Sequence, residues 1–82
     1  MSLSPTVDAE LDRSFSEPER ADARRILPAQ DEFGDGGERI LLAIIALSKG
    51  SLSALAHYSR SAKKDWRDVL YWHEYERDAN SR

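Results

Sequence analysis

The stretch Ile40-Leu41-Leu42-Ala43-Ile44-Ile45-Ala46-Leu47 is the most apolar part of the chain. If it forms a helix, Ile40 and Leu42 point in nearly opposite directions, and apolar side chains lie on several sides. Such a helix has no polar face to turn toward water, so other segments have to cover it. We therefore expect a central helix over residues 37–48, with Gly50 as its left-handed terminator.

Start and stop signals predict further helices on both sides of the central one. Three of them have approximate ranges of 5–14, 17–27 and 65–77, and a fourth begins after Ser51 as its cap. Ser16 and Glu19 fit a capping box, and Asp65 suits a cap that separates the last two helices, although a continuous bent helix is an alternative. The predicted fold class is all-α, a small bundle of four to five short helices packed around the apolar 40–47 helix.

The domain organisation follows from the length of 82 residues, which suits one small domain. Residues 1–15 are expected to form either an acidic N-terminal arm or a short amphipathic helix with an apolar stripe of Val7, Leu11 and Phe15. Residues 16–82 are expected to form a single helical domain. Residues 28–37, which hold three glycines, are the long loop candidate, with Phe33 tucked into the core.

Composition limits the classes of function. The chain has no cysteine and a net charge of −3, which removes disulfides and thiolate metal sites. Eight apolar residues cannot cross a bilayer, which needs about 20, and no basic segment followed by an apolar run opens the chain. A cytoplasmic location without membrane association is the expectation. Residues 1–36 are acidic and residues 49–82 mildly basic, so the front of the chain could lie over the back.

The last predicted helix carries aromatic side chains on two faces. Trp66, Val69 and Leu70 supply a core face, whereas Tyr71, Trp72 and Tyr75 fall together on roughly the opposite face. Two readings stay open for this second face. Either the N-terminal apolar stripe covers it, or it is exposed for a second copy of the chain or another protein, because tryptophan and tyrosine often anchor interfaces.

A resemblance rests on residues from the second half of the chain. The segments Ser48-Lys49-Gly50-Ser51-Leu52, Ala62-Lys63-Lys64-Asp65-Trp66-Arg67-Asp68-Val69-Leu70 and Trp72-x-Glu74-Tyr75 stand within residues 37–76. This pattern resembles that of a small family of uncharacterised bacterial helical proteins. The resemblance implies a bacterial, compact helical protein and carries no known activity. Residues 1–36 lie outside it.

Nucleic-acid binding is an alternative that rests on a basic stripe. Ala46-x-x-x-Gly50 has the spacing of a helix-turn-helix, and basic side chains follow it at His57, Arg60, Lys64 and Arg67. Lys49 and Ser51 flank the glycine where apolar residues are usual, and the total charge is acidic. Nucleic acid is therefore the second choice of partner.

Catalytic and metal-binding chemistry finds little support in the sequence. His57 and His73 are sixteen residues apart and belong to no known zinc motif, with Glu74 or Glu76 as the carboxylates considered. No serine stands in a recognisable nucleophile elbow. We expect no enzyme, no cofactor and no metal. The sequence favours a self-associating or protein-binding module, with homodimerisation first and Tyr71, Trp72 and Tyr75 as interface candidates.

Overall fold

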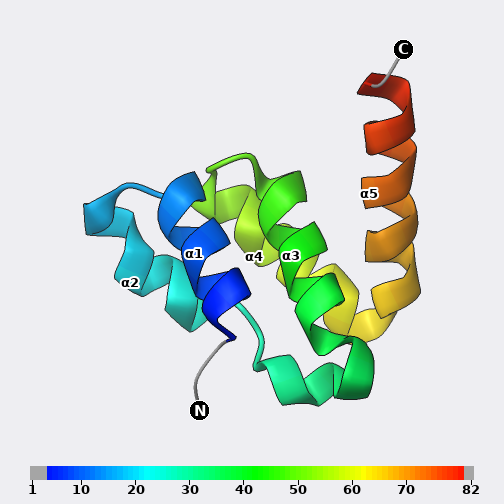
Figure 1. Cartoon of the computed structure of the whole chain (residues 1–82), viewed down its shortest axis with the longest axis horizontal. Helices are drawn as coiled ribbons and strands as arrows, with labels where there is room; N and C mark the ends of the chain where they lie inside the picture. Colours follow the sequence, from blue (N-terminus) through cyan, green and yellow to red (C-terminus); the bar gives the residue numbers. More distant parts are fainter. Residues whose placement is uncertain (1–3, 81–82) are drawn as a thin grey trace.

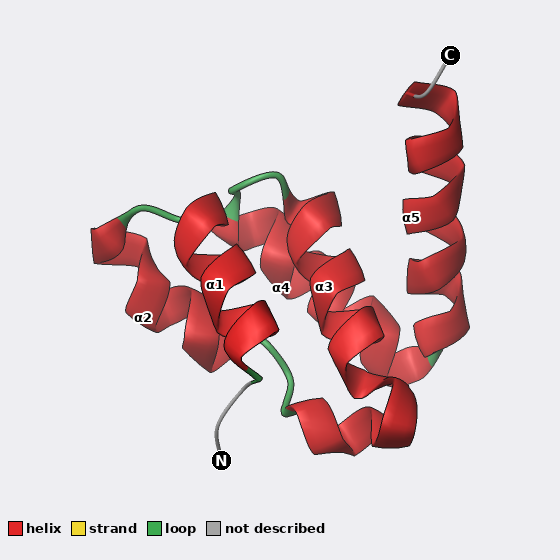
Figure 2. Cartoon of the chain, in the orientation of Figure 1, coloured by secondary structure: helices red, strands yellow, loops and turns green. Residues whose placement is uncertain are grey.

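The computed structural model describes residues 4–80, and the side chains of residues 4–76. Their elements, in chain order, are α1 (Pro5–Ser14), α2 (Glu17–Ile26), the 3-10 helix η1 (Gln30–Gly36), α3 (Gly37–Ser48), α4 (Leu52–Lys64) and α5 (Trp66–Asn80). No strand occurs in this part of the chain (Figure 2). The prediction of a small all-α bundle is therefore confirmed.

Helix α3 is the centre of the bundle. It packs against α1, η1, α4 and α5, and α1 and α5 lie on opposite sides of it (Figure 1). Its apolar stretch contributes six buried side chains, which are Ile40, Leu41, Ala43, Ile44, Ile45 and Leu47. Burial is not complete all round, because Ala46 is exposed and Leu42 is half-buried. The apolar stretch thus organises the core as its pattern predicted.

The N-terminal segment folds as a helix over the predicted range. The Ser4 hydroxyl accepts a hydrogen bond from the Val7 amide at 3.3 Å and caps α1. Val7 and Leu11 have no exposed surface, since α1 packs on α3 and α2. Of the two alternatives for residues 1–15, the described part of the chain therefore forms the short amphipathic helix. Residues 1–3 lie outside the described residues.

Helix α2 begins where predicted and ends one residue earlier. The Ser16 hydroxyl donates to the Glu19 carboxylate at 3.2 Å and makes no cap bond to the backbone, so the capping box forms only in part. Arg24 instead fixes α2 to α1, because its guanidinium donates to Asp8 at 3.2 Å and to Asp12 at 2.8 Å. These two hydrogen bonds, with the attraction of both carboxylates, raise the pKa of Arg24.

The prediction of a loop over residues 28–37 is wrong for most of its length. Residues Gln30–Gly36 form η1, which packs on α3. Gly37 approaches the Gln30 backbone so closely that a side chain at this position would meet the Gln30 carbonyl oxygen. Phe33 is half-buried against the core, as expected. The composition of this segment is typical of a loop. The packing of the Phe33 ring and the close approach at Gly37 hold it in a 3-10 helix instead.

The turn between α3 and α4 contains two left-handed residues. Lys49 has a φ of 50° and Gly50 a φ of 80°, so the lysine adopts the left-handed region as well as the predicted glycine. Ser51 then caps α4 by accepting a hydrogen bond from the Ala54 amide at 3.2 Å. Leu55, Ser59 and Ala62 form the inner face of α4 and are buried.

Helix α5 is separate from α4. Asp65 is extended between them, with φ −156° and ψ 99°, and its carboxylate accepts a hydrogen bond from the Arg67 amide at 3.1 Å. Val69 is fully buried and Leu70 packs on the core, but the prediction that Trp66 belongs to the core face is wrong. Its ring is 43% exposed, because it lies in the first turn of α5.

Candidate interaction surfaces

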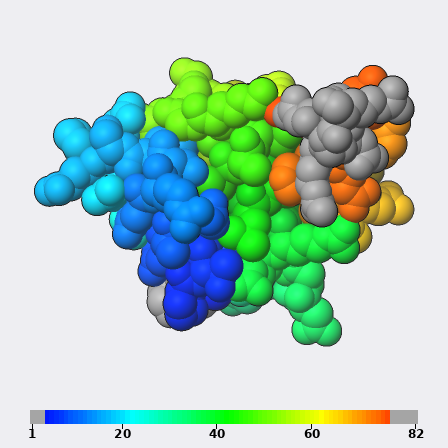
Figure 3. All heavy atoms as spheres, turned by 45° about the horizontal axis from the view of Figure 1, so that its top comes forward, coloured from blue at the N-terminus to red at the C-terminus, as the bar shows by residue number. Residues whose placement is uncertain are grey.

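The three aromatic residues singled out on α5 lie at the surface. Tyr71, Trp72 and Tyr75 are 66%, 38% and 69% exposed, and the rings of Tyr71 and Tyr75 stack with centroids 6.5 Å apart. We call these three residues the aromatic surface. The N-terminal apolar stripe does not cover it, because α1 lies on the opposite side of α3 from α5, as the space-filling view also shows (Figure 3).

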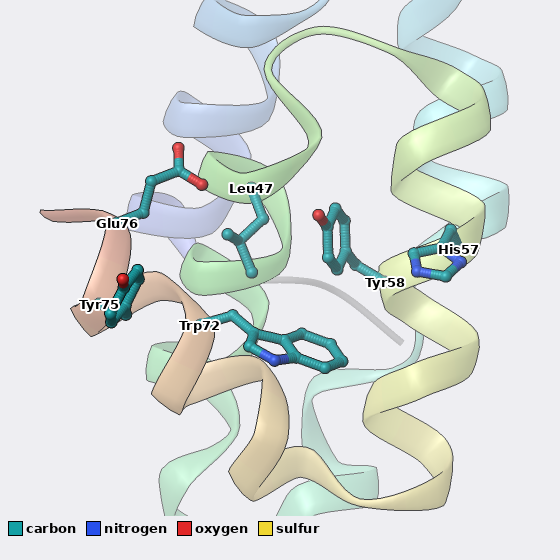
Figure 4. A pocket seen from close by; sticks show the side chains of 6 residues that line it. All are labelled: Leu47, His57, Tyr58, Trp72, Tyr75 and Glu76. Atoms are coloured by element: carbon teal, nitrogen blue, oxygen red, sulfur yellow. The ribbon is translucent and has the colours of Figure 1, made fainter. Parts of the chain in front are cut away.

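An open pocket of about 410 Å³ borders the aromatic surface. It lies between α3, α4 and α5, and Figure 4 shows the side chains that line it, which are Leu47, His57, Tyr58, Trp72, Tyr75 and Glu76. The Trp72 ring meets the Tyr58 ring edge to face, with centroids 5.9 Å apart. This contact leaves the indole partly exposed at the wall of what we call the aromatic pocket.

Ion pairs tie both flanks of α5 to α3 and to the turn after it. Lys49 pairs with Glu76 at 2.7 Å beside the aromatic pocket, and Arg39 pairs with Glu74 at 2.8 Å on the other flank. The hydrogen bond to Glu76 raises the pKa of the Lys49 ammonium. Because both pairs are exposed, they orient α5 more than they stabilise the fold.

The basic stripe expected on α4 is at the surface. His57, Arg60 and Lys64 are exposed and, with Ser61 and Lys63, line an open groove of about 450 Å³. Arg67 is also exposed but does not line this groove, and its guanidinium pairs with Asp65 at 3.1 Å. The hydrogen bonds from Arg67 lower the pKa of the Asp65 carboxyl. Arg67 is therefore paired at the start of α5, whereas the other three residues line the groove on α4.

The acidic front of the chain does not neutralise this stripe. Asp8 and Asp12 of α1 pair with Arg20 and Arg24 of α2 instead. The idea that the acidic N-terminal segment lies over the basic part of the chain is wrong for these residues. The charges of Asp8 and Asp12 are satisfied between α1 and α2, so these two residues leave the α4 groove open.

The two histidines lie on separate surfaces. His57 belongs to the α4 groove and the aromatic pocket, whereas half-buried His73 lines a pocket of about 250 Å³ with Glu38, Arg39, Leu42, Leu70 and Glu74. Among the described residues, no group of three or more histidine, aspartate or glutamate side chains is arranged to hold a metal ion. Within that range, no helix has the length and apolar character required to span a bilayer.

Sequence reasoning missed several residues of the aromatic pocket. Tyr58 follows His57 on α4 and Leu47 ends the apolar stretch, and neither carries a pattern that links it to α5. Only the packing of α4 beside α5 brings the Tyr58 ring to Trp72. Comparison of the chain with family models, with curated proteins and with solved structures finds no match.

Proposed function

We propose that this protein is a non-enzymatic association module that binds a second copy of itself through the aromatic surface. The single observation that carries the proposal is the exposure of Tyr71, Trp72 and Tyr75 on one face of α5, beside an open apolar pocket. Large rings bury much area on binding at low entropic cost, and they keep a polar tip for hydrogen bonds. The bacterial source and the cytoplasmic location stay predictions from the sequence.

The solution mass tests this proposal. We expect light scattering after size exclusion to show a dimer that dissociates on dilution, and we expect Trp72→Ala/Tyr75→Ala to stay monomeric. Tyr71→Ala/Tyr75→Ala removes only the two most exposed rings, so its loss of dimer cannot be ascribed to a damaged core. Trp66→Ala is the control, because this aromatic residue is also exposed, at 43%, but lies on the other side of α5. A wild-type monomer at every concentration would contradict the proposal.

A nucleic-acid-associated regulator is the second candidate. The observation that favours it is the open α4 groove, in which Arg60, Lys63 and Lys64 make no ion pair within the described residues. Phosphate contacts would make binding fall steeply with salt. Fluorescence anisotropy of a labelled DNA duplex tests this, and binding that persists in Arg60→Ala/Lys64→Ala would reject the basic groove as its site.

A further inference from the structure

The lysine and arginine side chains in residues 4–76 fall into two groups. Seven of the lysine and arginine side chains in residues 4–76 pair with a nearby carboxylate, and these are Arg13, Arg20, Arg24, Arg25, Arg39, Lys49 and Arg67. Arg60, Lys63 and Lys64 make no ion pair in that range, and all three are exposed on the second half of α4. We call them the basic cluster. Their charge is available to a partner.

A cluster of opposite sign lies on η1. Asp31, Glu32 and Asp35 are exposed and make no ion pair among the described residues. We call them the acidic cluster. The described residues thus include a group of three unpaired basic side chains on α4 and a group of three unpaired acidic side chains on η1. Each cluster has the charge that the other would attract from a second copy.

The elements next to the two clusters lie on either flank of α5. The basic cluster is continuous with the aromatic pocket, since His57 lines both hollows. On the other flank, Glu38 and Glu74 line the small pocket beside α5, and Glu38 stands in the first turn of α3, directly after η1. Figure 1 places η1 and the end of α4 at the same end of the bundle, where α5 begins. The elements that carry the two clusters, η1 and the end of α4, therefore both lie near the end of the bundle at which α5 begins.

The aromatic surface alone is too small for a stable dimer. At about 200 Å² per ring, the exposed fractions of Tyr71, Trp72 and Tyr75 amount to roughly 350 Å². A stable interface buries about 800 Å² on each partner. The contact proposed above must therefore extend beyond the flanks of α5, toward α4 and η1, the elements that carry the charged clusters.

We infer that the protein forms a twofold dimer in which α5 packs on α5 and the basic cluster of each copy meets the acidic cluster of the other. If the twofold axis is parallel to α5, each flank of α5 in one copy faces the opposite flank of α5 in its partner. The two charge contacts then form together, at the same end of the dimer. This inference rests on the proposed self-association and adds the charged contacts that fix its orientation.

Charge reversal tests the inference, because two variants reversed at opposite clusters should bind each other again when they are mixed. Arg60→Glu/Lys64→Glu leaves acidic side chains on both flanks, and Glu32→Lys/Asp35→Lys leaves basic ones. Each variant alone should show a dimer Kd raised at least about tenfold at low salt, because like charges then face each other. An equimolar mixture of the two should dimerise within about threefold of the wild type. The wild-type Kd should rise with salt. Arg25→Glu, on exposed α2 surface, is the control and should leave the Kd unchanged.

The outcomes separate this inference from the proposed function. If Tyr71→Ala/Tyr75→Ala dissociates the dimer but charge reversal leaves it intact, the aromatic interface is supported and the charged contacts are overturned. Charge reversal could instead weaken the dimer, with the mixture restoring it and the aromatic variant having no effect. This result would support the charged contacts and exclude the aromatic surface from the interface. A wild-type monomer overturns both. Loss of DNA binding in Arg60→Glu/Lys64→Glu, with normal dimerisation, would assign the basic cluster to nucleic acid and reject the inference.

Discussion

Two serines are buried in the core, and only one of them has a hydrogen-bond partner. The Ser48 hydroxyl donates to the Ile45 carbonyl oxygen at 2.6 Å. The Ser59 hydroxyl is buried on the inner face of α4 and has no partner among the described residues. A buried hydroxyl without a partner loses its hydrogen bond to water and gains nothing in return. The same residue type therefore has opposite energetic effects at the two positions.

This difference predicts the effect of removing each hydroxyl. Ser59→Ala should raise the free energy of unfolding by about 1 kcal/mol, because alanine suits the helix and leaves no polar atom unpaired. Ser48→Ala is the matched control and should lower it by about 1 kcal/mol through the lost hydrogen bond. Urea unfolding followed by circular dichroism measures both. A destabilised Ser59→Ala would mean that its hydroxyl has a partner in solution.

At the scale of elements, the sequence specified most helix boundaries through local chemistry. Ser51 acts as a cap where the pattern placed it, and Ser4 caps a helix that starts at the predicted residue, because a cap depends on a few adjacent residues. Residues Gln30–Gly36 were predicted as a loop, since glycines and acids give no helical period. Contacts with distant α3 hold this segment in η1. Local signals therefore failed where packing decided the backbone.

The junction between η1 and α3 predicts a contrast between adjacent glycines. Gly37→Ala should lower the free energy of unfolding by about 1–3 kcal/mol, because its new methyl group would meet the rigid Gln30 carbonyl oxygen. Gly36→Ala should be neutral or slightly stabilising, since the nearest atom to its methyl group would be Ile40 Cδ1 at 3.9 Å. Thermal unfolding of both variants checks this. Equal effects would show that the close approach at Gly37 does not constrain the fold.

At the scale of the whole molecule, the sequence indicated the aromatic surface only through an excess of aromatic residues on the last helix. The pattern put Tyr71, Trp72 and Tyr75 on one face but could not show whether another segment covers them. That depends on where α1 docks, and α1 buries Val7 and Leu11 on the opposite side of α3. The paired state of Arg67 and the free state of Lys63 likewise depend on side-chain geometry, which a spacing rule does not contain.

Self-association also predicts how stability depends on protein concentration. If the folded protein dimerises and the unfolded chain does not, dilution favours unfolding by mass action. Each tenfold increase in concentration above the dimer Kd stabilises a protomer by about 0.7 kcal/mol, which raises the Tm of a domain of this size by roughly 3–6 °C. Scanning calorimetry of the wild type should show this slope, and Tyr71→Ala/Tyr75→Ala should show a Tm independent of concentration. A flat wild-type profile above micromolar concentrations would mean that folding and association are not linked, and the aromatic surface would then need a different partner.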